Sequence, residues 1–314
     1  MPGPLNEALF ASLGLEDLVP PSLAVWRPLV FDGVRFFLQR LSPERRAELV
    51  LDQFALPGDA TAAERLVVVL GRCPTLHKLG QVIARHRGLN ADLRARLQTL
   101  ESLPPSTEIE PLLAHVRAQL PADARVELDN EALAEGSVAV VVPFTFEEDG
   151  ARKHGVFKVL KPGAAERMHE ELAIWLELGQ FLEERARALS LPALEFHDTL
   201  DSVRVLLANE VTLEVEQANL AAAAPFYRHD ARIMIPRLLP WCTQEMTAME
   251  RVFGVPVTAA PLDAAARRHL AATLTSGLLA QPFWTKDAWA VIHADPHAGN
   301  LFATDDGRLA VLDW

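Results

Sequence analysis

A short polar segment near the carboxyl end constrains the fold of this chain more than any other feature. In the run His293-Ala294-Asp295-Pro296-His297-Ala298-Gly299-Asn300, a carboxylate precedes an amide by five residues. A hairpin is predicted next, because Asp305-Asp306-Gly307 joins two short strand-like runs, Leu301–Thr304 and Leu309–Trp314. The second run carries Asp313, so three side chains suited to a metal ion or a proton follow one another in a fixed order.

This order suits phosphoryl transfer, which needs little covalent help from a protein. It needs a carboxylate beside the incoming hydroxyl group or water, and oxygen ligands for a Mg²⁺ ion that neutralises phosphate charge. Protein kinases place a catalytic aspartate five residues before a metal-binding asparagine, and a second metal-binding aspartate after a short hairpin. The spacing therefore predicts Asp295 as the catalytic carboxylate and Asn300 and Asp313 as Mg²⁺ ligands.

The residues of this segment by themselves also allow two other interpretations. One is a polar turn before a hairpin, without catalytic function. The other is a transition-metal cluster of His293, Asp295 and His297, because alternate residues of a strand share one face. Pro296 and the Gly299-Asn300 pair argue against a regular strand and therefore against the cluster.

The rest of the chain is typical of an α+β protein. Apolar spacing predicts helices up to about residue 120, with a break at Pro104-Pro105; two strands and a long helix over Ala164–Leu189 follow. The predicted amphipathic helices are Val25–Leu41, Glu44–Phe54, Ala62–Leu70 and Leu89–Leu103, and the predicted strands are Ser137–Phe146 and Gly155–Leu160, with a turn at Glu147–Gly150. We expect a helical extension at 1–120, a kinase-like N-lobe at 121–250, and a hinge with a partial C-lobe at 251–314.

Composition limits the environment and the partners. The formal net charge of -12 repels phosphate backbones, so nucleic acid is not an expected partner. Two cysteines, Cys73 and Cys242, fit a reducing cytoplasm, and the first residues contain no cationic signal-peptide region. No apolar run approaches the ~18–20 residues of a membrane span. The stripe in Val25–Leu41 suits a core face, or else a helix lying on a membrane surface.

Lys158, in Val156-Phe157-Lys158-Val159, lies between apolar neighbours on a predicted strand. Such a lysine is costly to bury unless it is paired, so it needs a phosphate or a carboxylate as partner. The segment resembles the strand lysine of protein kinases, which holds the α- and β-phosphates.

Four further segments resemble the UbiB (aarF-domain) family of atypical kinases. Lys78-Leu79-Gly80-Gln81 is similar to the family's Lys-x-Gly-Gln signature, which lies in a helical extension ahead of the kinase fold. Ala134-Glu135-Gly136-Ser137 lies in register with the Ala-rich loop that replaces the usual Gly-rich loop of kinases. Glu210–Asn219 resembles the stretch with the family's Glu-x-Asp motif and helix-C glutamate, and Met249–Pro256 looks like the hinge. The resemblance covers about residues 66–314.

The resemblance implies roles for individual residues. Glu216 would orient Lys158, while Gly136 and Ser137 would lie over the nucleotide. In the hinge, Glu250 and Val252 would contact adenine. Glu210 would pair with Lys78, so that the helix end containing Gly80 and Gln81 covers the nucleotide site and excludes protein substrates.

The sequence departs from the family pattern at several of these positions. Thr212 stands where the family has the aspartate of Glu-x-Asp, and Glu135-Gly136 replaces two alanines. Ala139-Val140 replaces Gly-Gln, and Trp314 replaces the phenylalanine of Asp-Phe-Gly. These departures leave the preference for ATP or ADP open.

The family resemblance implies a Mg²⁺-dependent ATPase or phosphotransferase with a non-protein, isoprenoid-related acceptor, in ubiquinone metabolism. It would be cytoplasmic or peripheral on the inner face of the membrane. A small-molecule phosphotransferase of the aminoglycoside or choline kinase type is the alternative, because such enzymes often end the hairpin in Asp-Trp, as Asp313-Trp314 does. A pseudokinase scaffold is a third possibility. Because Asp313 is the penultimate residue, we expect this chain by itself to be inactive and to expose an apolar patch on its C-lobe part.

Overall fold

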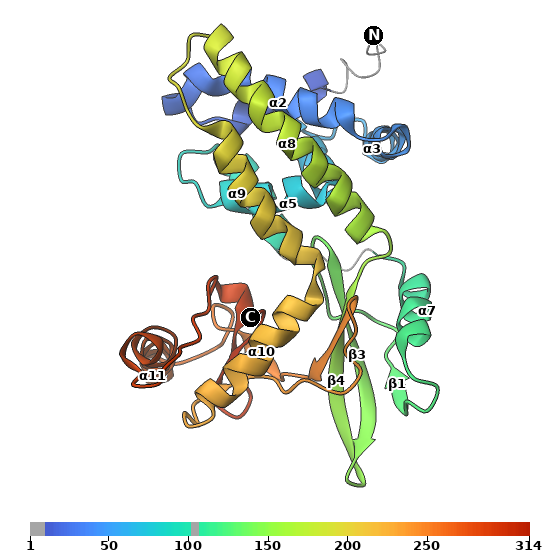
Figure 1. Ribbon diagram of the computed structural model, residues 1–314, viewed down its shortest axis with the longest axis vertical. Helices are drawn as coiled ribbons and strands as arrows, with labels where there is room; N and C mark the ends of the chain where they lie inside the picture. Colours follow the sequence, from blue (N-terminus) through green and yellow to red (C-terminus); the bar gives the residue numbers. More distant parts are fainter. Residues whose placement is uncertain (1–9, 102–106) are drawn as a thin grey trace. The chain divides into compact units, whose positions relative to one another are not determined.

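The computed structural model describes residues 10–101 and 107–314, which form two compact units. Of the described residues, unit 1 contains 10–101, 134–139 and 160–211, and unit 2 contains 107–133, 140–159 and 212–314. Helices and strands occur together, which confirms the expected α+β class (Figure 1). The three-domain division stays a prediction. The expected break at Pro104-Pro105 lies outside the described residues.

Unit 1 is mainly helical. Its elements are η1 (Leu15–Leu18), η2 (Pro21–Trp26), α2 (Arg27–Arg40), α3 (Pro43–Ala55), α4 (Ala62–Arg72), α5 (Pro74–Ala84), α6 (Ala91–Gln98), η3 (Thr99–Glu101), the short strand β2 (Ala134–Glu135), α8 (Ala164–Ala188), α9 (Phe196–Ala208) and η4 (Asn209–Val211). The long helices α8 and α9 lie side by side, and α2 and α5 also pack on α8 (Figure 1).

Local caps explain where several of these helices begin. Ser42 caps α3 by accepting the N–H of Arg45, and a proline follows it at the first helical position. Thr61 and Glu64 form a reciprocal capping box at the start of α4. The side chain of Asn90 accepts the N–H of Asp92 at the start of α6. These signals explain why the amphipathic segments predicted from the sequence agree with α3 and α4 to within a few residues; the segment at α2 agrees as well, without a side-chain cap.

The apolar stripe of α2 belongs mainly to the core of unit 1. Leu29, Phe37 and Leu41 are buried, and Phe36 stacks on Phe181 of α8 with ring centroids 4.3 Å apart. Val25, just before the helix, is exposed. The stripe is therefore a core face, and most of it is unavailable to a membrane surface. Among the described residues, no helix has the length and apolar character needed to span a bilayer.

Unit 2 contains two small sheets and their covering helices. Its elements are α7 (Ile109–Gln119), β1 (Val126–Leu128), β3 (Ala139–Glu148), β4 (Ala151–Leu160), α10 (Leu213–Tyr227), β5 (Ile233–Met234), β6 (Met246–Glu250), β7 (Gly254–Pro256), α11 (Ala264–Leu274), the π-helical η5 (Thr275–Ala280), α12 (Gln281–Trp284), η6 (Ala298–Asn300), β8 (Leu301–Thr304) and β9 (Leu309–Val311); β3 and β4 each have one terminal residue in unit 1. The strand orders are β1-β3-β4-β6 and β5-β9-β8-β7.

The β3–β4 hairpin is tight because its turn has only two residues. Asp149 and Gly150 have φ angles of 54° and 74°, which is the left-handed pair that matches the twist of antiparallel strands. The predicted four-residue turn at Glu147–Gly150 was thus too long, since β3 continues to Glu148. One face of the hairpin carries Phe144 and Phe157, whose stacked rings lie in the core that includes residues of α7.

The C-lobe part is better covered than the sequence suggested. Leu278 is buried, and Leu270 and Leu274 are partly buried against the core formed with β8, β9 and α10. The apolar patch expected on the C-lobe part therefore does not include these three leucines or strand β9. The exposed apolar side chains lie further along, at Leu279, Phe283, Trp284, Trp289 and Ile292.

We expect the double variant Phe283→Ser/Trp284→Ser to self-associate less than the parent chain. Both rings are mostly exposed at the end of α12, and exposed apolar patches drive association. Light scattering after size-exclusion chromatography, over a range of protein concentrations, measures the effect. Val25→Ser, at a single exposed valine in unit 1, is the matched control and should change nothing. Unaltered association of the double variant would show that this patch is not responsible.

Candidate active site

Lys158 is the centre of the polar cluster in unit 2. Its Nζ lies 2.6 Å from Glu216 Oε2 on α10 and 2.5 Å from Asp313 Oδ1 after β9. Burial alone would lower the pKa of Lys158, but Asp313 and Glu216 outweigh it and raise the pKa above its ordinary value. The lysine is therefore fully charged, held between two carboxylates, as expected for a strand lysine with apolar neighbours.

Gln217 fixes the helix that carries Glu216. Its Nε2 donates to the carbonyl oxygens of Thr243 and Met246 and to Oγ1 of Thr247 on β6. In the β4–β6 ladder Thr247 lies directly opposite Lys158. The helix glutamate and the strand lysine are thus positioned through the same part of the sheet. Gln217 was not predicted from the sequence, although its position next to Glu216 in the chain was a signal.

The polar segment before β8 folds into a compact turn that holds Asn300. The carbonyl oxygen of Asp295 accepts the N–H of His297 at 2.8 Å and Nδ2 of Asn300 at 3.2 Å. Asn300 is buried, and its own carbonyl accepts the N–H of Leu312 at 2.9 Å. The Asp295 carboxylate is largely exposed, with Oδ2 3.9 Å from Nε2 of His297. The five-residue spacing therefore produces one turn that presents an accessible carboxylate beside a fixed amide.

Asp313 turns back toward this segment instead of continuing the strand. The sequence predicted a strand over Leu309–Trp314, but β9 ends at Val311 and Asp313 has a φ of 61°. A non-glycine residue in this region is uncommon and marks a locally constrained backbone. The hydrogen bond from Leu312 N to Asn300 O and the ion pair with Lys158 account for the constraint.

His293 has a structural part in this site. Its Nε2–H donates to the carbonyl oxygen of Leu312 at 2.9 Å, and its ring lies edge-on to Trp314 at 4.9 Å. Within residues 10–101 and 107–314, no group of three or more histidine, cysteine, aspartate or glutamate side chains could hold a metal ion. The transition-metal cluster of His293, Asp295 and His297 is therefore wrong.

The donor set at the end of the hairpin fits Mg²⁺. This ion binds through one or two carboxylates and completes its shell with phosphate oxygens and water. Asp313 offers a half-exposed carboxylate, and because Asn300 uses Nδ2 to bond Asp295, its Oδ1 is the atom left for a cation. Asn300 directly precedes the β8–β9 hairpin and Asp313 follows it, and the chemistry of the two side chains suits a phosphate-bound magnesium ion.

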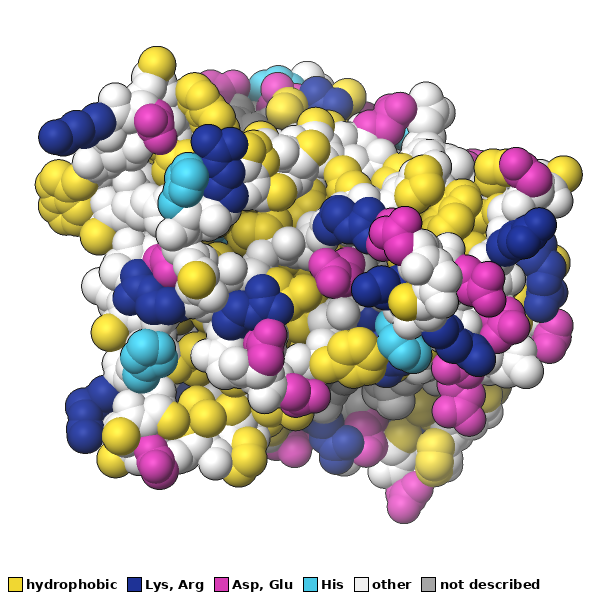
Figure 2. All heavy atoms as spheres, turned by 90° about the horizontal axis from the view of Figure 1, so that it is seen from below, with side chains coloured by type: hydrophobic (Ala, Val, Ile, Leu, Met, Phe, Trp, Pro, Cys, Tyr) yellow, Lys and Arg dark blue, Asp and Glu magenta, His cyan; other side chains and the backbone are white. Residues whose placement is uncertain are grey.

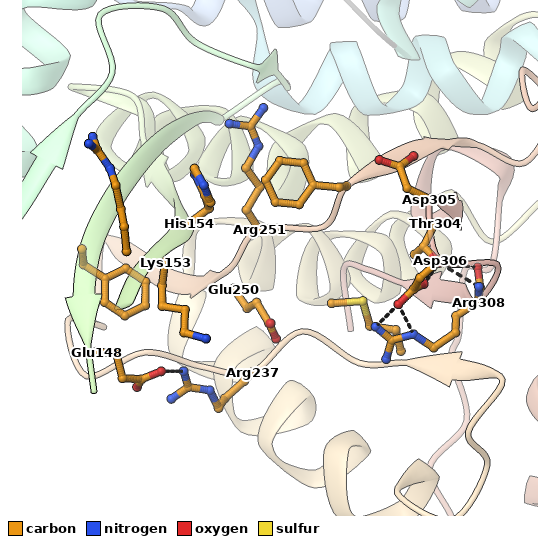
Figure 3. A pocket seen from close by; sticks show the side chains of 14 residues that line it. Glu148, Lys153, His154, Arg237, Glu250, Arg251, Thr304, Asp305, Asp306 and Arg308 are labelled. Atoms are coloured by element: carbon orange, nitrogen blue, oxygen red, sulfur yellow. Dashed lines mark hydrogen bonds and ion pairs between the residues drawn. The ribbon is translucent and has the colours of Figure 1, made fainter. Parts of the chain in front are cut away.

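The hinge presents Glu250 in an unexpected direction. Gly155 pairs with Glu250 across β4 and β6, so Glu250 lies on the face of the sheet opposite Lys158. There its side chain lines a pocket of about 350 Å³ with Lys153, Arg237 and Arg308, as Figure 3 shows. Its backbone N–H donates to the carbonyl of Arg237. An adenine contact from Glu250 would thus come from its carbonyl oxygen; this contact and the one from Val252 stay predictions.

In unit 1, helix α5 explains each residue of the Lys-x-Gly-Gln pattern. Lys78 Nζ lies 2.9 Å from Glu210 Oε2 on η4, so the expected ion pair is present. A side chain at Gly80 would come within 2.9 Å of Leu100, and Gln81 Nε2 donates to the Leu100 carbonyl at 2.8 Å. The glycine and glutamine thus dock α5 on η3. Whether this helix end covers the nucleotide site stays a prediction.

The loop expected to contact the nucleotide, with Gly136 and Ser137, also belongs to unit 1. Gly136 N donates to Ala139 O at 2.8 Å, which closes a tight turn between β2 and β3. Glu135 is buried and pairs with Lys161 just after β4, with Nζ and Oε1 2.6 Å apart. The departure from the family's alanine at this position therefore introduces a specific ion pair.

A strand lysine paired with a helix glutamate, and an Asp–Asn–Asp series around a hairpin, are typical of a protein-kinase-like fold. Residues 98–314 match the model of the ABC1 atypical kinase-like domain, and the chain belongs to this family. Relatives named "Probable protein kinase UbiB" confirm the predicted family. The one from Shewanella loihica is 26% identical over 308 residues, covering 93% of this chain and 51% of the relative. That from Azotobacter vinelandii is 30% identical over 249 residues, covering 74% and 43%.

A solved structure supports the fold. The complex of Rv3197 with erythromycin from Mycobacterium tuberculosis aligns with a TM-score of 0.51 at 19% identity, covering 87% of this chain and 66% of that one. The chain spans about half the length of the curated relatives it matches.

Proposed function

We propose that this protein binds Mg²⁺ and an adenine nucleotide at the Lys158–Asp313 cluster and uses them for ATP hydrolysis or phosphoryl transfer. The observation that carries the proposal is the position of Lys158 between Glu216 and Asp313 at 2.6 and 2.5 Å. Family membership supports it, since a kinase-like domain works through these side-chain types.

Each residue then has a distinct task. Lys158 exchanges its contact with Asp313 for the α- and β-phosphates, while Glu216 keeps the lysine oriented. Asp313 and Asn300 hold the metal ion, which neutralises phosphate charge when bound. Asp295, whose side chain is exposed and whose carbonyl accepts Nδ2 of Asn300, accepts the proton of the incoming hydroxyl group or water.

A small, non-protein acceptor is the substrate class we propose, related to lipids or isoprenoids in ubiquinone biosynthesis. The name of the relatives and the ion pair between Lys78 and Glu210 support this choice over the aminoglycoside or choline kinase type, which lacks that motif. A membrane surface would be the place of action, reached by peripheral binding. The face in Figure 2 mixes acidic with basic side chains, and the net charge of -12 also disfavours nucleic acid.

Lys158→Ala and Asp313→Ala should each weaken Mg²⁺–ATP or Mg²⁺–ADP binding by about 10–100-fold, because each removes a charge-assisted contact of ~1.5–3 kcal/mol. Isothermal titration calorimetry with and without Mg²⁺ measures this. Lys153→Ala is the matched control, since Lys153 lies on the same strand but on the opposite face. Equal affinities for the parent chain and both site variants would refute the proposal.

The same titrations distinguish an enzyme from a pseudokinase scaffold. A pseudokinase scaffold that has lost its nucleotide would give no binding, and no thermal stabilisation by Mg²⁺ with ATP or ADP. Nucleotide binding without turnover, and with Asp295→Asn indistinguishable from the parent chain, would favour a nucleotide-dependent scaffold over an enzyme.

A further inference from the structure

The side-chain amide of Gln217 faces three acceptors at the start of β6 and just before it. Its Nε2 lies 2.8 Å from the carbonyl oxygen of Thr243, 3.2 Å from that of Met246 and 3.1 Å from Oγ1 of Thr247. Two of these acceptors are carbonyl oxygens, which cannot donate, so the atom that contacts them must be the amide nitrogen. The N–H groups of Gln217 therefore bind α10 to the sheet.

The acceptors are held in place independently of Gln217. The backbone N–H of Thr243 donates to the carbonyl of Met246 at 2.7 Å, which closes a tight turn ahead of β6. The hydroxyl of Thr243 donates to Oε1 of Gln119 on α7, and Thr247 is fully buried in its strand. All of these residues belong to unit 2. A fixed set of acceptors restricts the amide to one position, and with it the helix that carries the amide.

The position of Gln217 matters because Glu216 directly precedes it on α10. Glu216 contacts Lys158 at 2.6 Å, and Thr247 lies opposite Lys158 in the β4–β6 ladder. The second carboxylate on the lysine is that of Asp313, whose side chain is 48% exposed, against 14% for Glu216. Water screens the more exposed ion pair more strongly. The contact with Asp313 is therefore the more easily replaced of the two.

We infer that Gln217 is a positioning residue, which keeps Glu216 on Lys158 and so leaves Asp313 as the carboxylate that a nucleotide displaces. Without the bonds of Gln217, the first turn of α10 is free to move away from β6, and Glu216 loses its fixed distance from the lysine. The amide acts through the helix and not on the nucleotide itself. The second half of this inference, the displacement of Asp313, rests on the proposed nucleotide function.

Chemical labelling of Lys158 in the intact chain, without nucleotide, tests the positioning. Only the neutral amine reacts with acetic anhydride; burial lowers the pKa of Lys158, but Asp313 and Glu216 raise it by more. Loss of the Glu216 contact should therefore lower this pKa and accelerate acetylation. In Gln217→Met, which keeps the volume and removes the donor, we expect an increase of about 3–10-fold at fixed pH, measured by mass spectrometry relative to the exposed Lys153.

Further variants keep the test decisive if Gln217→Met does not fold, which urea denaturation shows. Thr247→Val removes one acceptor at nearly constant volume and should give a smaller increase. Glu216→Gln removes the carboxylate itself and sets the upper limit. Gln244→Ala, at an exposed glutamine in the same turn, is the control and should give no increase. Unchanged labelling of Lys158 in Thr247→Val and in folded Gln217→Met would overturn the inference.

Nucleotide titrations of the same variants test the second half of the inference. Gln217→Met should weaken Mg²⁺–nucleotide binding about 3–10-fold, the effect expected for the loss of about one hydrogen bond. Faster labelling with unchanged affinity would refute the role of Gln217 in nucleotide binding. If the parent chain binds no nucleotide while Lys158 still reacts faster in Gln217→Met, the proposed function fails and the positioning of Glu216 is retained.

Discussion

Replacement of Glu171 by alanine is expected to lower the free energy of unfolding by about 3–5 kcal/mol, the cost of breaking a buried ion pair by removing one partner. Glu171 lies on α8 with a fully buried side chain. Its Oε1 lies 2.6 Å from Nη2 of Arg45, and its Oε2 accepts both the N–H and the hydroxyl of Thr75 at 2.9 and 2.7 Å. The alanine variant would leave three donors without their shared acceptor.

Burial determines the energetics of this cluster. Desolvation raises the pKa of Glu171 above its ordinary value, in spite of Arg45 and the two bonds from Thr75. Much of the attraction between Glu171 and Arg45 is therefore cancelled by the cost of removing both charges from water. An uncharged pair of similar shape should give the protein nearly the same stability. Its value lies in geometry, because Thr75 is at the start of α5, the helix that carries Lys78 and Gln81.

The control is the double variant Arg45→Met/Glu171→Gln, in which glutamine still accepts from Thr75 and no fully buried charge is left unpaired. Glu170, which also pairs with Arg45, is partly exposed and keeps its hydrogen bond from the N–H of Ser42. It should recover most of the stability lost in Glu171→Ala, as measured by urea denaturation. Glu177→Ala on the exposed side of α8 should lie within about 0.5 kcal/mol of the parent chain. A loss below about 1 kcal/mol for Glu171→Ala would show that the cluster relaxes around the missing carboxylate.

The sequence was sufficient for the parts of the site that depend on local spacing. Asp295 and Asn300 lie five residues apart on one turn. The residue pair Asp306-Gly307 favours a hairpin, and β8 and β9 form one. A lysine among apolar strand residues needs a carboxylate, and the two carboxylates in contact with Lys158 are Glu216 and Asp313. The apolar setting of Lys158 thus predicted that it needs a partner, the family resemblance indicated Glu216, and the contact with Asp313 was not predicted.

Other features depend on packing that no local pattern specifies. The cluster joins Glu171 on α8 to Arg45 and Thr75, which lie 126 and 96 residues earlier in the chain. The turn at Asp313 was missed because apolar residues up to Leu312 favour a longer strand, whereas the bond from Leu312 to Asn300 ends it. The side-chain direction of Glu250 required the register of β4 and β6, since a shift of one residue would reverse its face.

Gly254→Ala in the hinge is expected to destabilise unit 2 by about 2–5 kcal/mol, combining backbone strain of ~1–3 kcal/mol with overpacking of similar size. Gly254 begins β7 with a φ of 152°, a conformation that other residues rarely adopt. A β-carbon there would lie 2.3 Å from the carbonyl oxygen of Ala303 and 2.8 Å from Cα of Thr304. Both obstacles are backbone atoms of β8, so no side-chain rotation relieves the clash.

The consequence should reach the proposed nucleotide site, because β8 follows directly after Asn300 and pairs with β7 and β9. Separation of β7 from β8 would expose their amides and disturb the hinge between Glu250 and Gly254. Urea denaturation followed by tryptophan fluorescence gives the overall effect, and hydrogen exchange of β7 and β8 locates it. Gly71→Ala, in helix α4 with open space around the position, is the matched control and should be neutral or stabilising by up to about 1 kcal/mol. If Gly254→Ala matches the parent chain in both measurements, the close approach of β7 and β8 described here is incorrect.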